Sequence, residues 1–570
     1  MNKTIRRVVV FAGVLLVVLL LNLTWVQVIH APELRNHPRN FARTQLTQFG
    51  RQRGQITADG VVLASSHYDE ATKKFHRVYG KNADMWSPIT GYFSLYSRSG
   101  IEYAEDAILS GQDDKLFGDR VIDLFTGRDP RGGNVALTIK PDMQEAAWNA
   151  LQTGVGAGPL VGGVVAIQPS TGAILALASS PSYDPTPLAS FSNTAVNNYD
   201  EQLRAMRPSP LINRATAEPL PPGSTFKVVT TAALLRKGVN ANTYVSNAPR
   251  TILPDTVTPL ENYGGEYCGG STFGMAFAYS CNVPFADLSR KLTVREFQHT
   301  AESFGIGETY DIGVNEMAST IGDIPDAAAL AQSAIGQRNV ALTPLQNAII
   351  AATIANNGVR MKPYLVEAET AQDLSVLYEA KPKELNRAIS EKVAKQLTKL
   401  MITAEQYAGG VNTLTVPVAS KTGTAEHGTD SKNSIPYTWY IAFVPGHDVA
   451  VAVMIEGGAG VNRGSVGATV AGPVGRAVLK AALGQPTPKP VTPTYSNPSY
   501  QNAPSYQPTP TYTATVTPNY QGNGNGNGNG GNGNGGTGNG TGTAGNGNGN
   551  SGNGNTTGNG GTNTEGGDEE

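Results

Sequence analysis

The chain has 570 residues, enough for two or three domains whose cores do not depend on disulfides. Its 43 basic and 45 acidic side chains give a formal net charge of −2, which argues against a nucleic-acid partner. The glycine excess is concentrated in the C-terminal tail, so the average composition does not describe the rest of the chain.

Residues 1–30 predict a cytoplasmic stub and one transmembrane anchor. As a helix, the apolar run 8–29 spans about 33 Å, and a bilayer core is about 30 Å thick. We expect a single-pass protein of the cell membrane with a cytoplasmic N-terminus, because basic residues precede the run: Lys3, Arg6 and Arg7. The alternative is a cleaved signal peptide, but no small-x-small cleavage site precedes Pro32. Either way, the remainder is exported.

Residues 31–134 predict a small extracytoplasmic module without catalytic chemistry. Its clearest element is a strand–turn–strand over residues 53–64. At the other end of the chain, residues 485–570 form a tail rich in Pro, Thr and Tyr and then in Gly and Asn. This tail has too little apolar surface to bury and is predicted to be disordered.

Residues 135–484 predict the main domain, of α/β class, with one sheet flanked by helices. We expect its first strand at 135–139 and a helix from Pro141, followed by a hairpin over 164–178. Further segments complete the domain: helices at 224–236, 344–357 and 466–483, and strands at 415–423, 438–444 and 449–456.

Ser224 and Lys227 predict a nucleophile with an adjacent base. Pro221-Pro-Gly223 precedes Ser224 and an apolar periodic segment follows it, so we expect Ser224 at a helix N-terminus. Residues three apart share a helix face, which brings Lys227 beside the serine hydroxyl. A base at neutral pH requires the lysine pKa to fall by roughly three units from about 10.4. Burial and a second cation, for which Lys421 is suited, both lower it.

Two further motifs complete the predicted acyl-transfer site. Ser280-Cys-Asn282 offers a hydroxyl for proton relay and an amide as donor to a substrate backbone. Lys421-Thr-Gly-Thr424 ends a predicted strand, where Gly423 leaves room for a substrate to add as a further strand. Thr422 and Thr424 hydroxyls can bind a terminal carboxylate with the charge of Lys421, and the N–H groups of Ser224 and Thr424 can form an oxyanion hole.

The two cysteines, Cys268 and Cys281, leave two alternatives open. In an oxidising compartment they can close a loop beside Asn282, or they can be two buried free thiols. The sequence holds no metal-binding motif and no phosphate loop, so we expect no metal and no cofactor. His427 lies near the third motif, but a lone histidine in a polar loop is usually solvated.

The three motifs, in this order, resemble those of class B (monofunctional) penicillin-binding proteins, and most of all the short PbpA-type members. The resemblance covers residues 1 to about 484 and extends beyond the site. It includes the segments 53–60, 100–102, 213–215, 336–346, 355–358 and 439–443. The first of these is shorter than the usual family pattern.

The resemblance implies the serine β-lactamase-like transpeptidase fold and a peptidoglycan D,D-transpeptidase. Its substrates would be stem peptides on glycan made from lipid-linked precursor, with an acyl-enzyme at Ser224, release of terminal D-alanine and trapping by β-lactams. The N-terminal module lacks the glycosyltransferase signature of bifunctional relatives, which implies a SEDS-type glycosyltransferase as membrane partner. Two alternatives remain: a D,D-carboxypeptidase or β-lactamase using the same motifs, and a scaffold for a glycosyltransferase.

Overall fold

The computed structural model describes residues 3–26, 30, 49–116, 131–410, 413–428 and 433–485. The predicted tail, apart from its first residue, lies outside these residues. One helix, α1 (Lys3–Thr24), has 22 residues, and its most apolar window has a mean hydropathy of 2.4. By length and composition it can cross a membrane.

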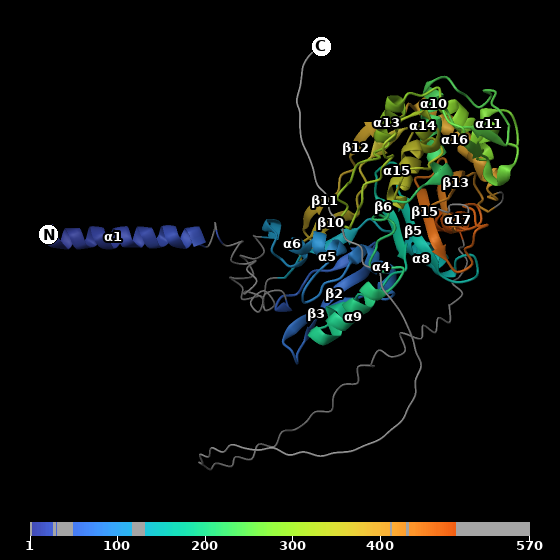
Figure 1. Cartoon of the computed structure of the whole chain (residues 1–570). Helices are drawn as coiled ribbons and strands as arrows, with labels where there is room; N and C mark the ends of the chain where they lie inside the picture. The colour runs from blue at the N-terminus through green and yellow to red at the C-terminus, as the bar shows by residue number, and fades with distance from the viewer. Residues whose placement is uncertain are drawn as a thin grey trace, which may run out of the picture. The chain divides into compact units, whose positions relative to one another are not determined.

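A five-stranded antiparallel sheet lies at the centre of the main domain (Figure 1). Its order is β13-β14-β15-β5-β6, so β13 is an edge strand. The bounds agree with the predicted strands to within a few residues: β5 Leu160–Ile167, β6 Ile174–Ser180, β13 Ala419–Ala425, β14 Tyr437–Phe443 and β15 Ala450–Gly458. The strands read as continuous apolar runs because both faces of the sheet are covered.

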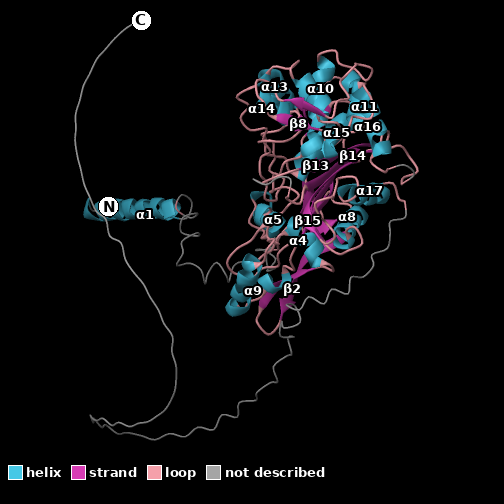
Figure 2. Cartoon of the chain, turned by 45° about the vertical axis from the view of Figure 1, so that its right-hand side comes forward, coloured by secondary structure: helices cyan, strands magenta, loops and turns pink. Residues whose placement is uncertain are grey.

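Helices cover the two faces of this sheet, as the sequence predicted (Figure 2). On one face, α8 (Pro141–Thr153) and α17 (Ala471–Ala482) pack on residues such as Val164 and Val451. On the other, α15 (Pro344–Ala355) and α16 (Glu391–Tyr407) pack on the face that contains Val165 and Ile441, and α10 (Lys227–Arg236) packs on α16. Further helices extend this layer: α11 Phe273–Ala278, α12 Val283–Ser289, α13 Val294–Ser303 and α14 Ala327–Ser333.

A second sheet combines residues that are distant in the sequence. Its order is β11-β10-β4-β1-β2-β3, with these bounds: β1 Ile56–Ala58, β2 Val61–Asp69, β3 Lys74–Tyr79, β4 Asn134–Leu137, β10 Val366–Thr370 and β11 Val376–Glu379. We expected the strand at 135 to open the main domain. Instead, β4 pairs in parallel with β1 and antiparallel with β10, so the N-terminal module is completed by strands from beyond residue 365.

The hairpin predicted over residues 53–64 is formed by β1 and β2. Ala58 pairs with Val61, so the loop contains only Asp59 and Gly60, whose φ angles are 47° and 81°. Two consecutive positive φ angles define a type I′ turn, for which Asp-Gly is a preferred pair. The shortened motif is therefore compatible with a tight hairpin.

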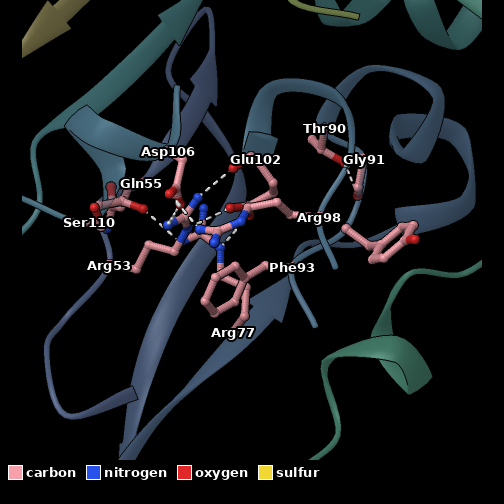
Figure 3. Close-up of polar contacts among 12 residues, drawn as sticks. Arg53, Gln55, Arg77, Thr90, Gly91, Phe93, Arg98, Glu102, Asp106 and Ser110 are labelled. Atoms are coloured by element: carbon pink, nitrogen blue, oxygen red, sulfur yellow. Dashed lines mark hydrogen bonds and ion pairs between the residues drawn. The ribbon is translucent and has the colours of Figure 1, made fainter. Parts of the chain in front are cut away.

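Near this hairpin, a buried carboxylate is held by two buried guanidinium groups (Figure 3). Glu102, on α5 (Gly100–Ala104), is 0% exposed, and it accepts from Arg53 Nε at 2.6 Å and Arg77 Nε at 2.5 Å. Arg53 also bonds Asp106 at 2.6 Å, and Arg98 pairs with the same aspartate. This cluster joins the start of the hairpin sheet to α5.

Replacing Glu102 with alanine should destabilise this module strongly, because it leaves two buried arginines without their shared anion. Removing one partner of a buried pair costs about 3–5 kcal/mol. When the full-length protein is melted in detergent, we expect the first unfolding transition of this variant to have a lower midpoint temperature. Glu70→Ala is the matched control, since Glu70 and Lys73 form an ion pair in solvent. Equal midpoints for the two variants would contradict the prediction.

Candidate active site

Ser224 lies in a short 3-10 turn rather than in the first turn of an α-helix. The turn, η5, covers Gly223–Phe226, and α10 begins at Lys227. Two contacts fix the turn from outside: Trp439 Nε1 donates to the Pro221 carbonyl at 2.8 Å, and Gly223 N donates to the Gly336 carbonyl at 3.0 Å. The half-buried Ser224 is thus held between β14 and the segment before α15.

Lys227 is fully buried one helical turn after Ser224. Its Nζ donates to the Ser280 carbonyl at 2.6 Å and to Asn282 Oδ1 at 2.8 Å. Within the described residues, these two groups, and not the Ser224 hydroxyl, are its hydrogen-bond acceptors. The structure thus brings the first two motifs together through the lysine.

Ser280 connects the two lysines of the site. Its carbonyl accepts from Lys227 and its hydroxyl accepts from Lys421 Nζ at 2.8 Å. Ser280 has a φ of 61°, in the left-handed region that non-glycine residues rarely adopt. Such strain persists only where surrounding contacts impose it.

Asn282 is held by the segment before the disulfide. Its amide Nδ2 donates to the Glu261 carbonyl at 2.9 Å, and its backbone N donates to Asn262 Oδ1 at 2.9 Å. One of the two amide hydrogens of Asn282 is therefore used in this bond to Glu261. The other remains for the predicted contact with a substrate. Cys268 and Cys281 are bonded to each other with a Cα–Cα distance of 5.8 Å. Asn262 was missed, because nothing in the sequence marks an asparagine 20 residues before its partner.

Lys421 reaches Ser280 from the edge strand β13. It is buried, and its Nζ also donates to the Thr422 carbonyl at 3.0 Å. Burial lowers the pKa of Lys421 to about 7. Burial, and then the charge of Lys421, lower the pKa of Lys227 well below its ordinary value. These are the two causes expected for a lysine that acts as a base.

Gly423 allows β13 to approach the serine turn. A Cβ there would lie 2.5 Å from the Pro222 carbonyl oxygen and 3.0 Å from Thr225 Cγ2. We expected this glycine to make room for substrate, whereas its lack of a side chain lets η5 pack on the strand. Thr424, the next residue, accepts a hydrogen bond from Gly467 N at 3.3 Å through Oγ1. Thr422 is half-buried.

His427 belongs to the hairpin between β13 and β14. Its ring stacks on Tyr437 with centroids 3.9 Å apart, and Nε2 lies 2.7 Å from the Ile435 carbonyl oxygen. Both contacts of the His427 ring are therefore with residues of this hairpin.

A serine in a short turn, two buried lysines of lowered pKa and a second serine that accepts a hydrogen bond from each lysine define a serine acyltransferase site. The model of the penicillin binding protein transpeptidase domain matches residues 162–480, and that of the penicillin binding protein A dimerisation domain matches residues 53–135. The chain belongs to the penicillin-binding protein transpeptidase family, and PbpA proteins are among its relatives, with about half of their residues identical.

Two similar proteins can be aligned with this chain over 85% of its length. It is 50% identical to the peptidoglycan D,D-transpeptidase PbpA of Mycolicibacterium smegmatis, over 85% of this chain and 99% of that protein. It is 48% identical to PbpA of Mycobacterium tuberculosis H37Rv, over 85% of this chain and 100% of that protein. A ceftriaxone acyl-enzyme structure of penicillin-binding protein A from M. tuberculosis matches with a TM-score of 0.74 and 47% identity, covering 77% of this chain and all of that one (100%).

The lowered lysine pKa values predict how stability depends on pH. Above about pH 7, folded Lys421 loses its proton while the unfolded chain keeps it up to about pH 10.5, so unfolding takes up a proton. The free energy of unfolding should therefore rise with pH in this interval, by about 1.4 kcal/mol per pH unit for each such proton. Below about pH 7 both states carry the proton, so the dependence on pH vanishes while the destabilisation by the buried charge is fully present.

Lys421→Met should flatten this rise, both by removing its own proton and by returning the Lys227 pKa toward its ordinary value. Thermal midpoints of the full-length protein between pH 7 and 9.5 measure the slope. Lys73→Met, at an exposed lysine, is the matched control and should keep the wild-type slope. Parallel curves for all three proteins would contradict the assignment.

Proposed function

We propose that this protein is a peptidoglycan D,D-transpeptidase that cross-links stem peptides through an acyl-enzyme at Ser224. The observation that carries the proposal is the contact of two buried lysines with Ser280: Lys227, one helical turn after Ser224, bonds its carbonyl and Lys421 bonds its hydroxyl. It supplies a lysine, Lys227, whose pKa is lowered well below its ordinary value by burial and by the charge of Lys421, and a hydroxyl that can pass a proton. The family of the chain and its acyl-enzyme relatives support the same chemistry.

In the first half-reaction, Ser224 Oγ attacks the carbonyl carbon of the penultimate D-alanine, and neutral Lys227 accepts the hydroxyl proton. The N–H groups of Ser224 and Thr424 stabilise the oxyanion of the tetrahedral intermediate. Its collapse breaks the peptide bond. The departing D-alanine nitrogen receives a proton through the Ser280 hydroxyl, which is hydrogen-bonded to Lys421.

In the second half-reaction, the amine of a neighbouring stem peptide attacks the ester at Ser224. The amine loses a proton to the same groups, the ester bond breaks, and the serine hydroxyl is restored. A β-lactam opens at the same serine and leaves a slowly hydrolysed ester.

The edge strand β13 provides the substrate platform. Among the described strands it pairs only with β14, so a stem peptide can add as a further strand along its other edge. Lys421, Thr422 and Thr424 bind the terminal carboxylate, and the remaining amide hydrogen of Asn282 contacts the peptide backbone. Gly423 keeps this platform next to the serine turn.

The protein is anchored through α1, with the basic N-terminus in the cytoplasm and the catalytic domain outside. The basic residues Lys3, Arg6 and Arg7 at the start of α1 support this orientation. Because the N-terminal module lacks glycan-polymerising chemistry, a SEDS-type glycosyltransferase in the membrane supplies the glycan strands. Residues 31–134 form the non-catalytic module and residues 135–484 the transpeptidase domain, apart from the strands that complete the module's sheet.

Covalent labelling tests the nucleophile. A fluorescent penicillin should label the full-length protein in detergent, and Ser224→Ala should abolish the labelled band on a denaturing gel. Ser192→Ala, which alters an exposed N-cap serine of α9 (Asn193–Ala205), is the matched control and should label normally. Labelling that persists in Ser224→Ala would show that another residue is the nucleophile.

Product analysis separates cross-linking from hydrolysis. With a donor ending in D-Ala-D-Ala and an added amine acceptor, mass spectrometry should detect the amide-linked product together with free D-alanine. Hydrolysed donor alone would favour a D,D-carboxypeptidase. Absence of any turnover by a protein that still binds penicillin would favour a scaffolding role.

A further inference from the structure

The last turn of α16 contacts the residue that directly precedes each of two site residues. Glu405 bonds Ser420, the residue before Lys421. The Tyr407 ring contacts that of Tyr279, the residue before Ser280, with the two rings tilted by 41°. The hydrogen bond between Lys421 and Ser280 joins residues 141 apart in the sequence, and α16 touches the backbone segments on both sides of it.

Glu405 is the centre of a buried network behind β13. It is 4% exposed and accepts from three side chains: the Ser420 hydroxyl, the Tyr440 hydroxyl at 3.1 Å and Arg476 Nε at 2.7 Å. Arg476 also donates to the Ala408 carbonyl at 2.8 Å, so it closes the end of α16 as well. The carboxylate thus ties α16 to β13, β14 and α17.

Tyr407 makes the second connection at the protein surface. Its ring centroid lies 4.4 Å from that of Tyr279, and the two rings are 48% and 47% exposed. Offset or tilted aromatic pairs at this distance are attractive. Tyr279 ends α11 immediately before Ser280, whose positive φ must be imposed by contacts around it.

The edge position of β13 makes such support necessary. In the described part of the chain, main-chain pairing restrains β13 from one side, through β14. The 2.8 Å contact between Lys421 and Ser280 therefore depends on what holds the strand and the loop after α11 in place. Both are held by residues only two positions apart on a single rigid helix.

We propose that Glu405 and Tyr407 are positioning residues, and that the last turn of α16 sets the separation of Ser280 and Lys421 for acylation of Ser224. This inference rests on the acyl transfer proposed above. Neither residue touches the reacting atoms; each acts through the residue that precedes Ser280 or Lys421.

Two variants cut the two connections separately. Ser420→Ala removes the hydroxyl that links Glu405 to β13 and leaves the buried ion pair with Arg476 intact. Tyr407→Leu removes the ring contact with Tyr279 at the surface. The measurement is acylation of the full-length protein in detergent by a chromogenic β-lactam, separated into the affinity for the β-lactam and the rate constant of the chemical step. Each variant should lower the rate constant about tenfold or more, because small misplacements of reacting groups are costly, with little change in affinity.

Matched controls distinguish positioning from general loss of stability. Ser87→Ala removes a buried hydroxyl bonded to Ser182, beside the opposite edge of the same sheet, and Tyr103→Leu removes a tyrosine that is 69% exposed on α5. Both controls should acylate at the wild-type rate. Tyr407→Phe, which keeps the ring, should restore most of the rate lost in Tyr407→Leu.

Rate constants equal to those of the controls would overturn the proposal, whatever the melting temperatures. So would a lower melting temperature with an unchanged rate constant, since that result identifies a structural role alone. If Ser420→Ala does not fold, the acylation rate constant of the surface variant Tyr407→Leu decides whether the proposal holds. Failure of wild-type protein to acylate at Ser224 would instead refute the proposed function, so the two failures are distinguishable.

Discussion

The site depends on two lysine side chains buried within reach of one serine. Lys227 and Lys421 both contact Ser280, the first through its carbonyl and the second through its hydroxyl. Burying two like charges is unfavourable, and this cost is what lowers their pKa values. The proposed mechanism uses this result, because a neutral lysine can take a proton from Ser224 where an ordinary, protonated lysine cannot.

The rest of the transpeptidase domain keeps these groups together against their repulsion. α10 and β13 are far apart in the sequence. They meet because Gly423 lets the serine turn, which leads into α10, pack on the strand. Trp439 holds the same turn from β14, and Asn262 holds the Ser280–Asn282 loop from the other side. Each support is a neutral hydrogen bond or a close backbone approach, which adds no further charge to the site.

The N-terminal module is joined to the transpeptidase domain by shared backbone pairing. The strands β10 and β11 leave the catalytic domain and complete the sheet that begins with β1. Within the module, the cluster around Glu102 ties this sheet to α5 (Figure 3). The module therefore cannot be cut from the chain as a single sequence segment.

Local chemistry let the sequence alone determine much of this protein. The spacing of Ser224 and Lys227, the turn at Asp59-Gly60, the apolar strands and the anchor helix each depend on neighbouring residues, so they can be predicted from the sequence. The order of the three motifs and the family resemblance then identified the acyl-transfer chemistry. Only the tertiary structure decided that β4 joins the module, that Gly423 serves packing and that Asn262 and Glu405 support the site. These roles arise from contacts between segments that are distant in sequence, and no local pattern records such contacts.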